Sequence, residues 1–246
     1  MSYHVFASYY DRLTCEVDYW QRAHYFDQLI RQHITVSDET ILLDLACGTG
    51  SLTTELSCLG YDVIGVDASA DMLSVAMSKS TAGKRILYLC QDSAELDLYG
   101  TIDVAVCALD SLNHITDAEK LQKTFEKVSL FTAPGGLFVF DVNTEYKHRE
   151  ILGNQTFVYD LDDLYCVWQN TTDETLTTEI FLDFFVRQGE QYFRESESFC
   201  ERAWPREQLC NLLERTGYEL LKIYEGDTFQ PIGPQSQRAV YVARKK

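Results

Sequence analysis

Short apolar segments alternate with amphipathic segments along roughly the first 140 residues of the chain. The apolar segments are rich in Leu, Ile and Val, as strands buried on both faces of a sheet are. Segments long enough for helices separate them. This alternation predicts parallel strands covered by helices. The five predicted strands are Ile41–Leu45, Asp62–Val66, Arg85–Cys90, Ile102–Cys107 and Leu137–Asp141.

Helical periodicity is clearest in Asp117–Phe131, where Leu121, Phe125 and Val128 recur on one face. An earlier stretch, Asp18–His33, has the same kind of apolar stripe. Both segments are therefore predicted to be amphipathic helices that pack against the sheet.

The C-terminal part continues the pattern. Pro205 opens a predicted helix that runs through Thr216, and Gly217 ends it, since proline favours the first helical position and glycine the position after the last. Two more strands follow, at Tyr218–Tyr224 and Ala239–Ala243. The whole pattern predicts an α/β fold with a doubly wound, Rossmann-like, seven-stranded and mostly parallel sheet.

One segment interrupts the alternation. About 60 residues separate the fifth strand from the Pro205 helix, far more than an ordinary connection needs. β-branched and aromatic residues are abundant there, and Gln188-Gly189-Glu190 supplies a turn. We interpret this segment as an antiparallel β insertion after the fifth strand. Its three predicted strands are Tyr165–Thr171, Thr175–Arg187 and Gln191–Arg202.

The insertion divides the chain into two parts. Residues 1–153 and 203–246 form the predicted nucleotide-binding domain, and residues 154–202 form a lid over the open edge of its site. Alternation along the lid strands predicts one apolar face, which we expect to carry Phe181, Phe185, Phe193 and Phe199.

A glycine-rich turn follows the first strand. Gly48 and Gly50 would let the backbone approach a ligand closely, where a Cβ would collide. The second strand ends at Asp67, seventeen residues after Gly50, where a carboxylate can accept hydrogen bonds from a ribose diol. Gln91-Asp92-Ser93 follows the third strand and is placed to receive an adenine amino group. This layout predicts a nucleotide-type cofactor.

Two cofactor classes share the layout. A dinucleotide oxidoreductase needs a third glycine so that a helix can approach the pyrophosphate, but Thr53 occupies that position. Asp44 precedes the glycines, and a carboxylate there would repel a pyrophosphate. It suits the cationic methionine end of S-adenosylmethionine (SAM) instead. The residues therefore favour SAM over NAD.

The pattern D-x-A-x-G-x-G from Asp44 to Gly50, followed by acids at Asp67 and Asp92, resembles the motifs of class I SAM-dependent methyltransferases. Further segments resemble the small bacterial YqeM-like methyltransferases, and the likeness spans nearly the whole chain. These segments are Phe6–Leu13, Val17–Tyr19, Asp110–His114, Phe184–Glu190 and Glu201–Ala203.

The resemblance implies a SAM site, with Ala46 standing where many class I enzymes have glycine. It also favours Tyr10 and Tyr19 near the methionine end, where a tyrosine ring can attract the sulfonium; as an alternative, both are core aromatics of a packed helix. The residues expected to bind SAM are Tyr10, Tyr19, Asp44, Ala46, Gly48, Gly50, Asp67, Ala68, Met72, Gln91, Asp92, Ser93 and Leu109.

Acceptor chemistry is less clear from the sequence. Asn113 and His114 follow the fourth strand, at the edge of the sheet where ligands bind in such folds, and are the candidate catalytic residues. His114 could accept a proton near neutral pH. Alternatively, Asn113 caps the next turn and His114 packs beneath the helix. No metal site is predicted.

Charge limits the substrate classes. The chain has 38 acidic and 21 basic residues, for a net charge of −17, which opposes binding to nucleic acid phosphates. Eight cysteines without a C-x-x-C pair, and a start that lacks a signal-peptide pattern, predict a cytoplasmic protein with reduced thiols. We therefore expect a methyltransferase acting on N or O of a small molecule. The alternatives are a protein or RNA methyltransferase and a SAM-binding protein without catalysis.

Overall fold

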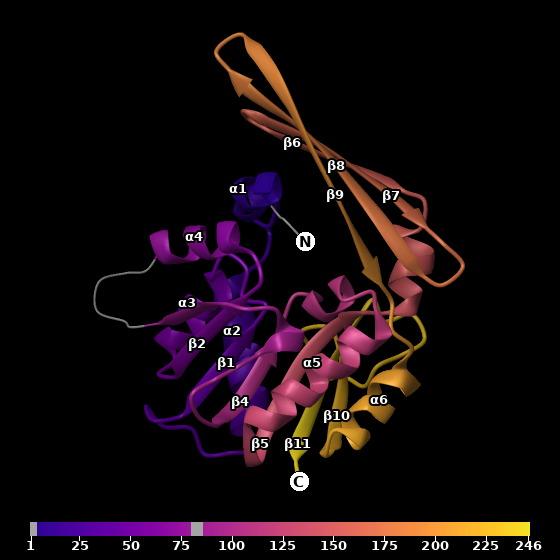
Figure 1. The fold of residues 1–246 in the computed structure, drawn as a ribbon. Helices are drawn as coiled ribbons and strands as arrows, with labels where there is room; N and C mark the ends of the chain where they lie inside the picture. The colour runs from indigo at the N-terminus through magenta and orange to yellow at the C-terminus, as the bar shows by residue number, and fades with distance from the viewer. Residues whose placement is uncertain (1–3, 80–85) are drawn as a thin grey trace.

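The structure is a computed structural model that describes residues 4–79 and 86–246. Seven strands form the main sheet in the order β10-β11-β5-β4-β1-β2-β3 (Figure 1). Within the described part of this sheet, β11 alone runs opposite to the other six strands, and it pairs antiparallel with β5 and β10. These strands are β1 (Ile41–Leu45), β2 (Asp62–Asp67), β3 (Leu87–Cys90), β4 (Ile102–Cys107), β5 (Thr132–Asn143), β10 (Tyr218–Glu225) and β11 (Arg238–Lys245).

This sheet confirms the predicted doubly wound and mostly parallel fold. Predicted and observed strands agree to within a few residues, apart from β5, which begins at Thr132 instead of Leu137. Arg85, the predicted first residue of the third strand, lies outside the described residues.

Helices cover both faces of the main sheet. They are α2 (Tyr19–Arg31), α3 (Ser51–Cys58), α4 (Ala70–Ser78), α5 (Ala118–Phe131) and α6 (Arg206–Arg215). Leu42 packs with α2 and α3, whereas its neighbour Leu43 packs with α5 and α6, because successive side chains of a strand point to opposite faces. The core therefore has two layers, one on each side of the sheet.

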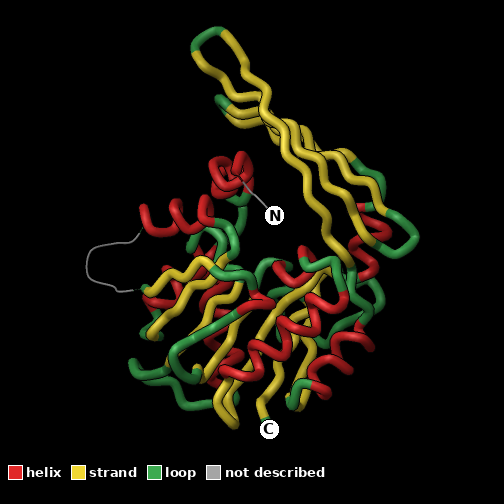
Figure 2. Tube along the Cα trace, in the orientation of Figure 1, coloured by secondary structure: helices red, strands yellow, loops and turns green. Residues whose placement is uncertain are grey.

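A second, antiparallel sheet rises from the end of β5. It has the order β6-β7-β8-β9 and stands over the carboxyl ends of the main sheet (Figure 2). A π-helical turn, η3 (Lys147–Leu152), leads into it. The strands are β6 (Thr156–Leu161), β7 (Leu164–Thr172), β8 (Thr177–Gln188) and β9 (Gln191–Arg202). The antiparallel insertion predicted after the fifth strand is thus present, with β6 as an additional strand.

The apolar face of this second sheet differs from the prediction. Residues paired across antiparallel strands share a face, and Phe199 pairs with Ile180 while Phe193 pairs with Val186. Phe181 and Phe185 lie on the opposite, outer face. The predicted set of four phenylalanines on one face was therefore wrong. The buried side chains of β8 are Ile180, Leu182 and Phe184.

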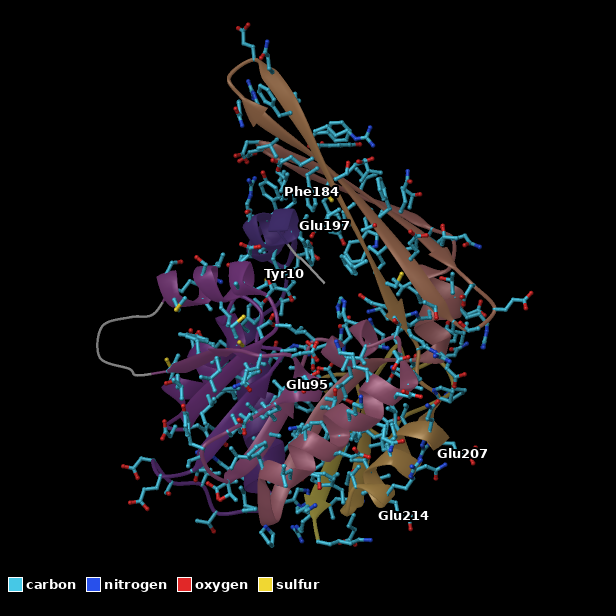
Figure 3. All side chains as sticks on the ribbon, viewed as in Figure 1. Tyr10, Glu95, Phe184, Glu197, Glu207 and Glu214 are labelled. Atoms are coloured by element: carbon cyan, nitrogen blue, oxygen red, sulfur yellow. The ribbon has the colours of Figure 1, made fainter. Side chains whose placement is uncertain are left out.

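A short helix, α1 (His4–Leu13), joins the two sheets. Its Phe6 and Ala7 form one apolar cluster with the second sheet and with Met72 of α4. Figure 3 shows Phe184 and Glu197 of the second sheet reaching down towards α1, which carries Tyr10. Helix α1 therefore lies between the second sheet and the carboxyl ends of the main sheet.

Candidate cofactor and acceptor site

One cavity opens where the parallel strands of the main sheet end, below α1 and the second sheet. About 1000 Å³ of empty space, open solvent included, lies between its lining residues. Its lining comes from the ends of β1, β2 and β4, from α1 and α4, and from a short helix, η2 (Ser111–His114). The expected SAM residues on this cavity are Tyr10, Ala46, Gly48, Asp67, Ala68, Met72, Gln91, Asp92, Ser93 and Leu109.

The turn after β1 gives the cavity its floor. Ala46, Gly48 and Gly50 all have positive φ, at 58°, 55° and 70°, so the backbone turns sharply before α3 begins at Ser51. The amide of Cys47 donates to the carbonyl of Val66 and ties the turn to the end of β2. Short-range backbone geometry therefore fixes this part of the site.

The two glycines have different roles. A Cβ on Gly48 would meet nothing within 4 Å, and Gly48 lines the cavity. A Cβ on Gly50 would come within 2.5 Å of the Tyr88 hydroxyl and 2.8 Å of Ala76. Gly50 thus allows close packing against α4 and β3, and it does not line the cavity as expected. Of the two, only Gly48 leaves open space for a ligand.

Asp67 lies at the end of β2 and faces the cavity. Its two carboxylate oxygens accept hydrogen bonds from the amides of Gly48 and Ser69, each at 2.8 Å. Burial raises the pKa of Asp67, although the two amides act to lower it. The carboxylate is therefore held in a fixed orientation by the same turn that exposes Gly48.

The segment after β3 forms a second wall. Asp92 caps the turn at Ala94 through one oxygen and pairs with Lys120 through the other, at 2.5 Å. The side chain of Gln91 forms two hydrogen bonds with the backbone of Asp97. Ser93 bonds to Thr124. These hydrogen bonds hold the wall in place, and all three residues line the cavity.

A smaller hollow adjoins the cavity, with Tyr10, Ala46, Gly48, Leu109 and Ser111 shared between them. Tyr19 and Asp44, which do not reach the main cavity, line this hollow. Asp44 is buried and accepts a hydrogen bond of 2.6 Å from the Thr53 hydroxyl. Burial raises the pKa of Asp44 to about 7. A cation in the hollow would stabilise the carboxylate form of Asp44.

The two candidate catalytic residues lie in different environments. His114 ends η2, lines the cavity, and stacks against the ring of Phe199 at 5.2 Å. Asn113 is completely buried and does not line the cavity. Its amide donates to the carbonyls of Asn143 and Arg202 and accepts from the Asn143 amide, so it joins η2 to β5 and β9. The structure thus corrects the catalytic assignment of Asn113, which is a structural link.

A buried ion network, not predicted from the sequence, holds the turn before η2. Leu109 and Asp110 adopt positive φ, at 57° and 52°, which is strained for residues with a Cβ. Both of their amides donate to the carboxylate of Asp141, at 2.9 and 2.7 Å. Arg22 and Arg238 also donate to Asp141. Asp141 therefore holds the turn from which His114 projects.

Arg238 links this network to the cavity side. It donates to Asp110 at 2.6 Å in addition to Asp141. Burial alone would raise the pKa of Asp110, but the charges of Arg238, Lys147 and His114 and the hydrogen bond from Arg238 together outweigh burial and hold that pKa below its usual value.

Glu201 of β9 was also not predicted from the sequence as a site residue. It is buried, and its carboxylate lies 3.5 Å from Nε2 of His114. Burial, reinforced by the negative charge of Asp110, raises the pKa of Glu201 to about 8. Burial lowers the pKa of His114. Sequence gave no signal for this pair, since 87 positions (201 minus 114) separate its members.

Comparisons with known proteins agree with this geometry. Residues 42–136 match a family model described as a methyltransferase domain. Over 247 aligned residues, covering 100% of this chain and 98% of the relative, the chain is 32% identical to YqeM of Bacillus subtilis, a protein named as a methyltransferase. A crystal structure of an S-adenosylmethionine-dependent methyltransferase from Clostridium acetobutylicum superposes with a TM-score of 0.89 and 33% identity, covering 99% of this chain and 98% of that one.

A further likeness concerns the fold alone. The sugar N-methyltransferase KedS8 from Streptoalloteichus matches with a TM-score of 0.80 at 19% identity, over 96% of this chain and 91% of that one.

The fold and the cavity define a class I SAM-dependent methyltransferase, and SAM is its cofactor. The chain belongs to the family of YqeM-type bacterial methyltransferases. No helix in the described part of the chain is long and apolar enough to cross a membrane.

Proposed function

We propose that this enzyme transfers the SAM methyl group to a nitrogen or oxygen atom of a small-molecule acceptor bound beneath the second sheet. One observation carries the proposal: a single cavity joins the glycine turn and Asp67 to His114. Cofactor and acceptor would therefore meet in one enclosed space, which is what direct transfer between them requires.

The residues present fit SAM. Gly48 leaves free space beside a sharply turned backbone, and the fixed carboxylate of Asp67 would accept hydrogen bonds from the ribose diol. Gln91, Asp92 and Ser93 would surround the adenine. Asp44, Tyr10 and Tyr19 line the smaller hollow, which suits the cationic methionine end. Among the expected residues, Gly50 has an indirect role, because it lets the turn pack closely against Tyr88 and Ala76.

SAM supplies an activated methyl group, so the protein's contribution is mainly to align the acceptor for in-line displacement. His114 is the proposed group that accepts a proton from an acceptor that arrives protonated. We assign Asn113 no chemical step. Its hydrogen bonds to β5 and β9 hold η2, and with it His114, in position.

We propose that residues 154–202 act as a lid, whereas residues 1–153 and 203–246 bind SAM. Together with α1, the second sheet covers the cavity, and Phe199 and Glu201 of β9 reach its acceptor side. Such a cover excludes water and shapes the acceptor pocket.

A small molecule is the favoured acceptor for two reasons. The net charge of −17 opposes polyanion binding, and the lid leaves little room for a folded macromolecule. Relatives with such substrates exist: a glycine/sarcosine N-methyltransferase of Halorhodospira halochloris is 27% identical over 128 residues, 51% of this chain and 48% of that protein. RNA that bound in the micromolar range at physiological salt would contradict this choice.

The proposal can be tested with a matched pair of glycines. Gly48 and Gly135 both have positive φ and open space on the Cβ side, but Gly135 lies away from the cavity. A Gly48→Val change should lower SAM affinity at least tenfold by calorimetry, because the side chain occupies cofactor space. Gly135→Val carries the same backbone strain and should leave SAM affinity unchanged. Equal losses in both variants would refute the placement.

Turnover is tested separately. Release of S-adenosylhomocysteine should be detected when the protein is incubated with SAM and a panel of small metabolites. SAM binding without release on any small-molecule, protein or RNA acceptor would identify a SAM-binding protein without catalysis.

A further inference from the structure

The acceptor side of the cavity contains an unusual group of three side chains. Potential ligand atoms of Asp110, His114 and Glu201 lie within 4.8 Å of one another. His114 has a quarter of its side chain exposed to the cavity, and Glu201 is almost completely buried behind it. Of the three, His114 lines the cavity, and the two carboxylates lie behind it.

Glu201 differs from the other carboxylates around it. Asp110 and Asp141 are paired with Arg238, and Asp141 also with Arg22. Among the described residues, no lysine or arginine lies within 4.0 Å of the Glu201 carboxylate, which contacts His114 and forms a hydrogen bond with the side chain of Asn143. A buried carboxylate without a cation is unfavourable. Its ionised form would be stabilised by a positive charge entering the cavity.

The remaining charged groups near His114 do not supply that charge. Asp67 faces it from β2 and adds negative charge. Lys147 of η3 lies near Glu201, but its ammonium donates to Asn143 at 2.9 Å. His148, also on η3, bonds to Thr178. When Glu201 is ionised, counting Asp67, Asp110, Asp141 and Glu201 against Arg22, Arg238 and Lys147 leaves one negative charge in excess.

We propose that Glu201 and His114 form the subsite for the amino group of an amine acceptor, so that the enzyme is an N-methyltransferase. This rests on the methyl transfer proposed above. An amine arrives as an ammonium ion, which supplies the missing positive charge. A hydroxyl acceptor brings no charge, and its deprotonated form would be an anion among carboxylates.

Proton chemistry also favours an amine. An alkyl ammonium has a pKa of about 10, whereas the pKa of an alcohol hydroxyl is far higher and out of reach for an imidazole. In the proposed reaction the ammonium proton passes to the His114 imidazole, and Glu201 stabilises the imidazolium. The amine lone pair then forms the N–C bond while the C–S bond breaks and its electron pair passes to sulfur. The products are a methylated ammonium and S-adenosylhomocysteine.

Matched acceptor pairs provide the first test. Alkyl amines and their hydroxyl analogues, such as glycine and glycolate or an amino sugar and its parent sugar, are compared by S-adenosylhomocysteine release. Release should occur with amines, and Glu201→Gln should lower it at least tenfold. Glu179→Gln, an exposed glutamate on the outer face of the same sheet, is the matched control. Preferred turnover of hydroxyl members would overturn the amine subsite while leaving methyl transfer intact.

If none of the tested acceptors is a substrate, a binding measurement still tests the amine subsite. Nuclear magnetic resonance follows the His114 imidazole of the S-adenosylhomocysteine complex, identified with His114→Asn, during addition of methylammonium or methanol at constant ionic strength. In the wild-type protein, methylammonium should shift the signal saturably. In Glu201→Gln, the methylammonium affinity obtained from this shift should be at least tenfold lower. The wild-type affinity should increase as the pH rises through the Glu201 pKa of about 8.

The alternative results are also decisive. A shift equal in Glu201→Gln and wild type, equal for methanol, or absent would reject the amine subsite. If S-adenosylhomocysteine itself fails to bind, the proposed function fails instead.

Discussion

The cofactor half and the acceptor half of the cavity are built in different ways. The cofactor half comes from three consecutive strand ends, and its polar groups bond mainly to backbone close to them in sequence or on the next strand: Asp67 to Gly48 and Ser69, and Asp92 to Ala94. The acceptor half brings together η2, β5, β9 and β11, and its polar groups bond to one another across long sequence separations.

This difference separates two kinds of constraint. Backbone amides cannot change with mutation, so the cofactor half depends on a turn that glycine permits. The acceptor half depends on pairs of ionisable side chains, in which a single substitution leaves a buried charge without its partner. We therefore expect substitutions in the acceptor half to affect folding, and those in the cofactor half to affect binding.

The largest effect is expected at Asp141. Asp141→Asn removes the charge that compensates Arg22 and Arg238 and disturbs the hold on the turn at Leu109 and Asp110. Breaking a buried pair in this way costs about 3–5 kcal/mol, measured as the free energy of unfolding in urea.

The control is Asp163→Asn, which breaks the exposed pair with Arg12 and should cost less than about 1 kcal/mol. A similar, small decrease in the free energy of unfolding for both variants would contradict the expectation that substitutions in the acceptor half affect folding.

In the cofactor half, Asp67→Ala should affect binding while the protein stays folded. If Asp67 holds the ribose diol, each charge-assisted hydrogen bond contributes about 1.5–3 kcal/mol. SAM affinity measured by calorimetry should then fall at least tenfold, and Asp67→Glu should have a milder effect. Asp62→Ala, at the exposed start of the same strand, should bind as wild type. An unchanged dissociation constant in Asp67→Ala would remove Asp67 from the cofactor site.

A smaller effect, in pH dependence, tests the hollow around Asp44. A bound sulfonium prefers the carboxylate, so SAM affinity should decrease several-fold as the pH falls through the Asp44 pKa of about 7. The stability of the SAM-free protein should change with pH in the opposite direction. Folding raises this pKa from 3.8, so the folded state binds more protons between 3.8 and about 7, and the free energy of unfolding increases as the pH falls through that range.

Asp44→Asn should remove the trend in SAM affinity and the part of the stability trend that comes from Asp44. Glu201 contributes to the stability trend with the same sign, so only the difference between wild type and Asp44→Asn reports on Asp44. A SAM affinity that is independent of pH in wild type would contradict the assignment.

The cofactor half could be predicted from sequence because its signals are local. The apolar strand, the glycines and the acid at Asp67 lie within 27 residues of one another (41 to 67). Gly50 was misassigned because sequence cannot distinguish a glycine that faces a ligand from one that faces Tyr88.

The second sheet was predicted in part. Apolar residues occupy both alternating sets of β8, Ile180, Leu182 and Phe184 on one face and Phe181 and Phe185 on the other. Alternation alone therefore could not choose the inner face, which depends on the pairing with β9. The strand β6 was missed because its alternate residues are exposed and its pattern is weak.

The acceptor half could be predicted least. Only His114 was found, from its place after the fourth strand. The other charged residues lie in or at the ends of strands, and their roles depend on partners that are distant in sequence. These residues are Asp141, Glu201 and Arg238. A single sequence has no local signal for such pairs.

The position of β11 has a consequence for synthesis of the protein. β11 follows the other described strands in sequence, yet it lies between β5 and β10 in the main sheet. During translation β10 cannot join the sheet until β11 has left the ribosome and inserted beside β5. Arg238 arrives with that strand. The glycine turn can thus form early, whereas the ion network that Arg238 makes with Asp110 and Asp141 is completed last.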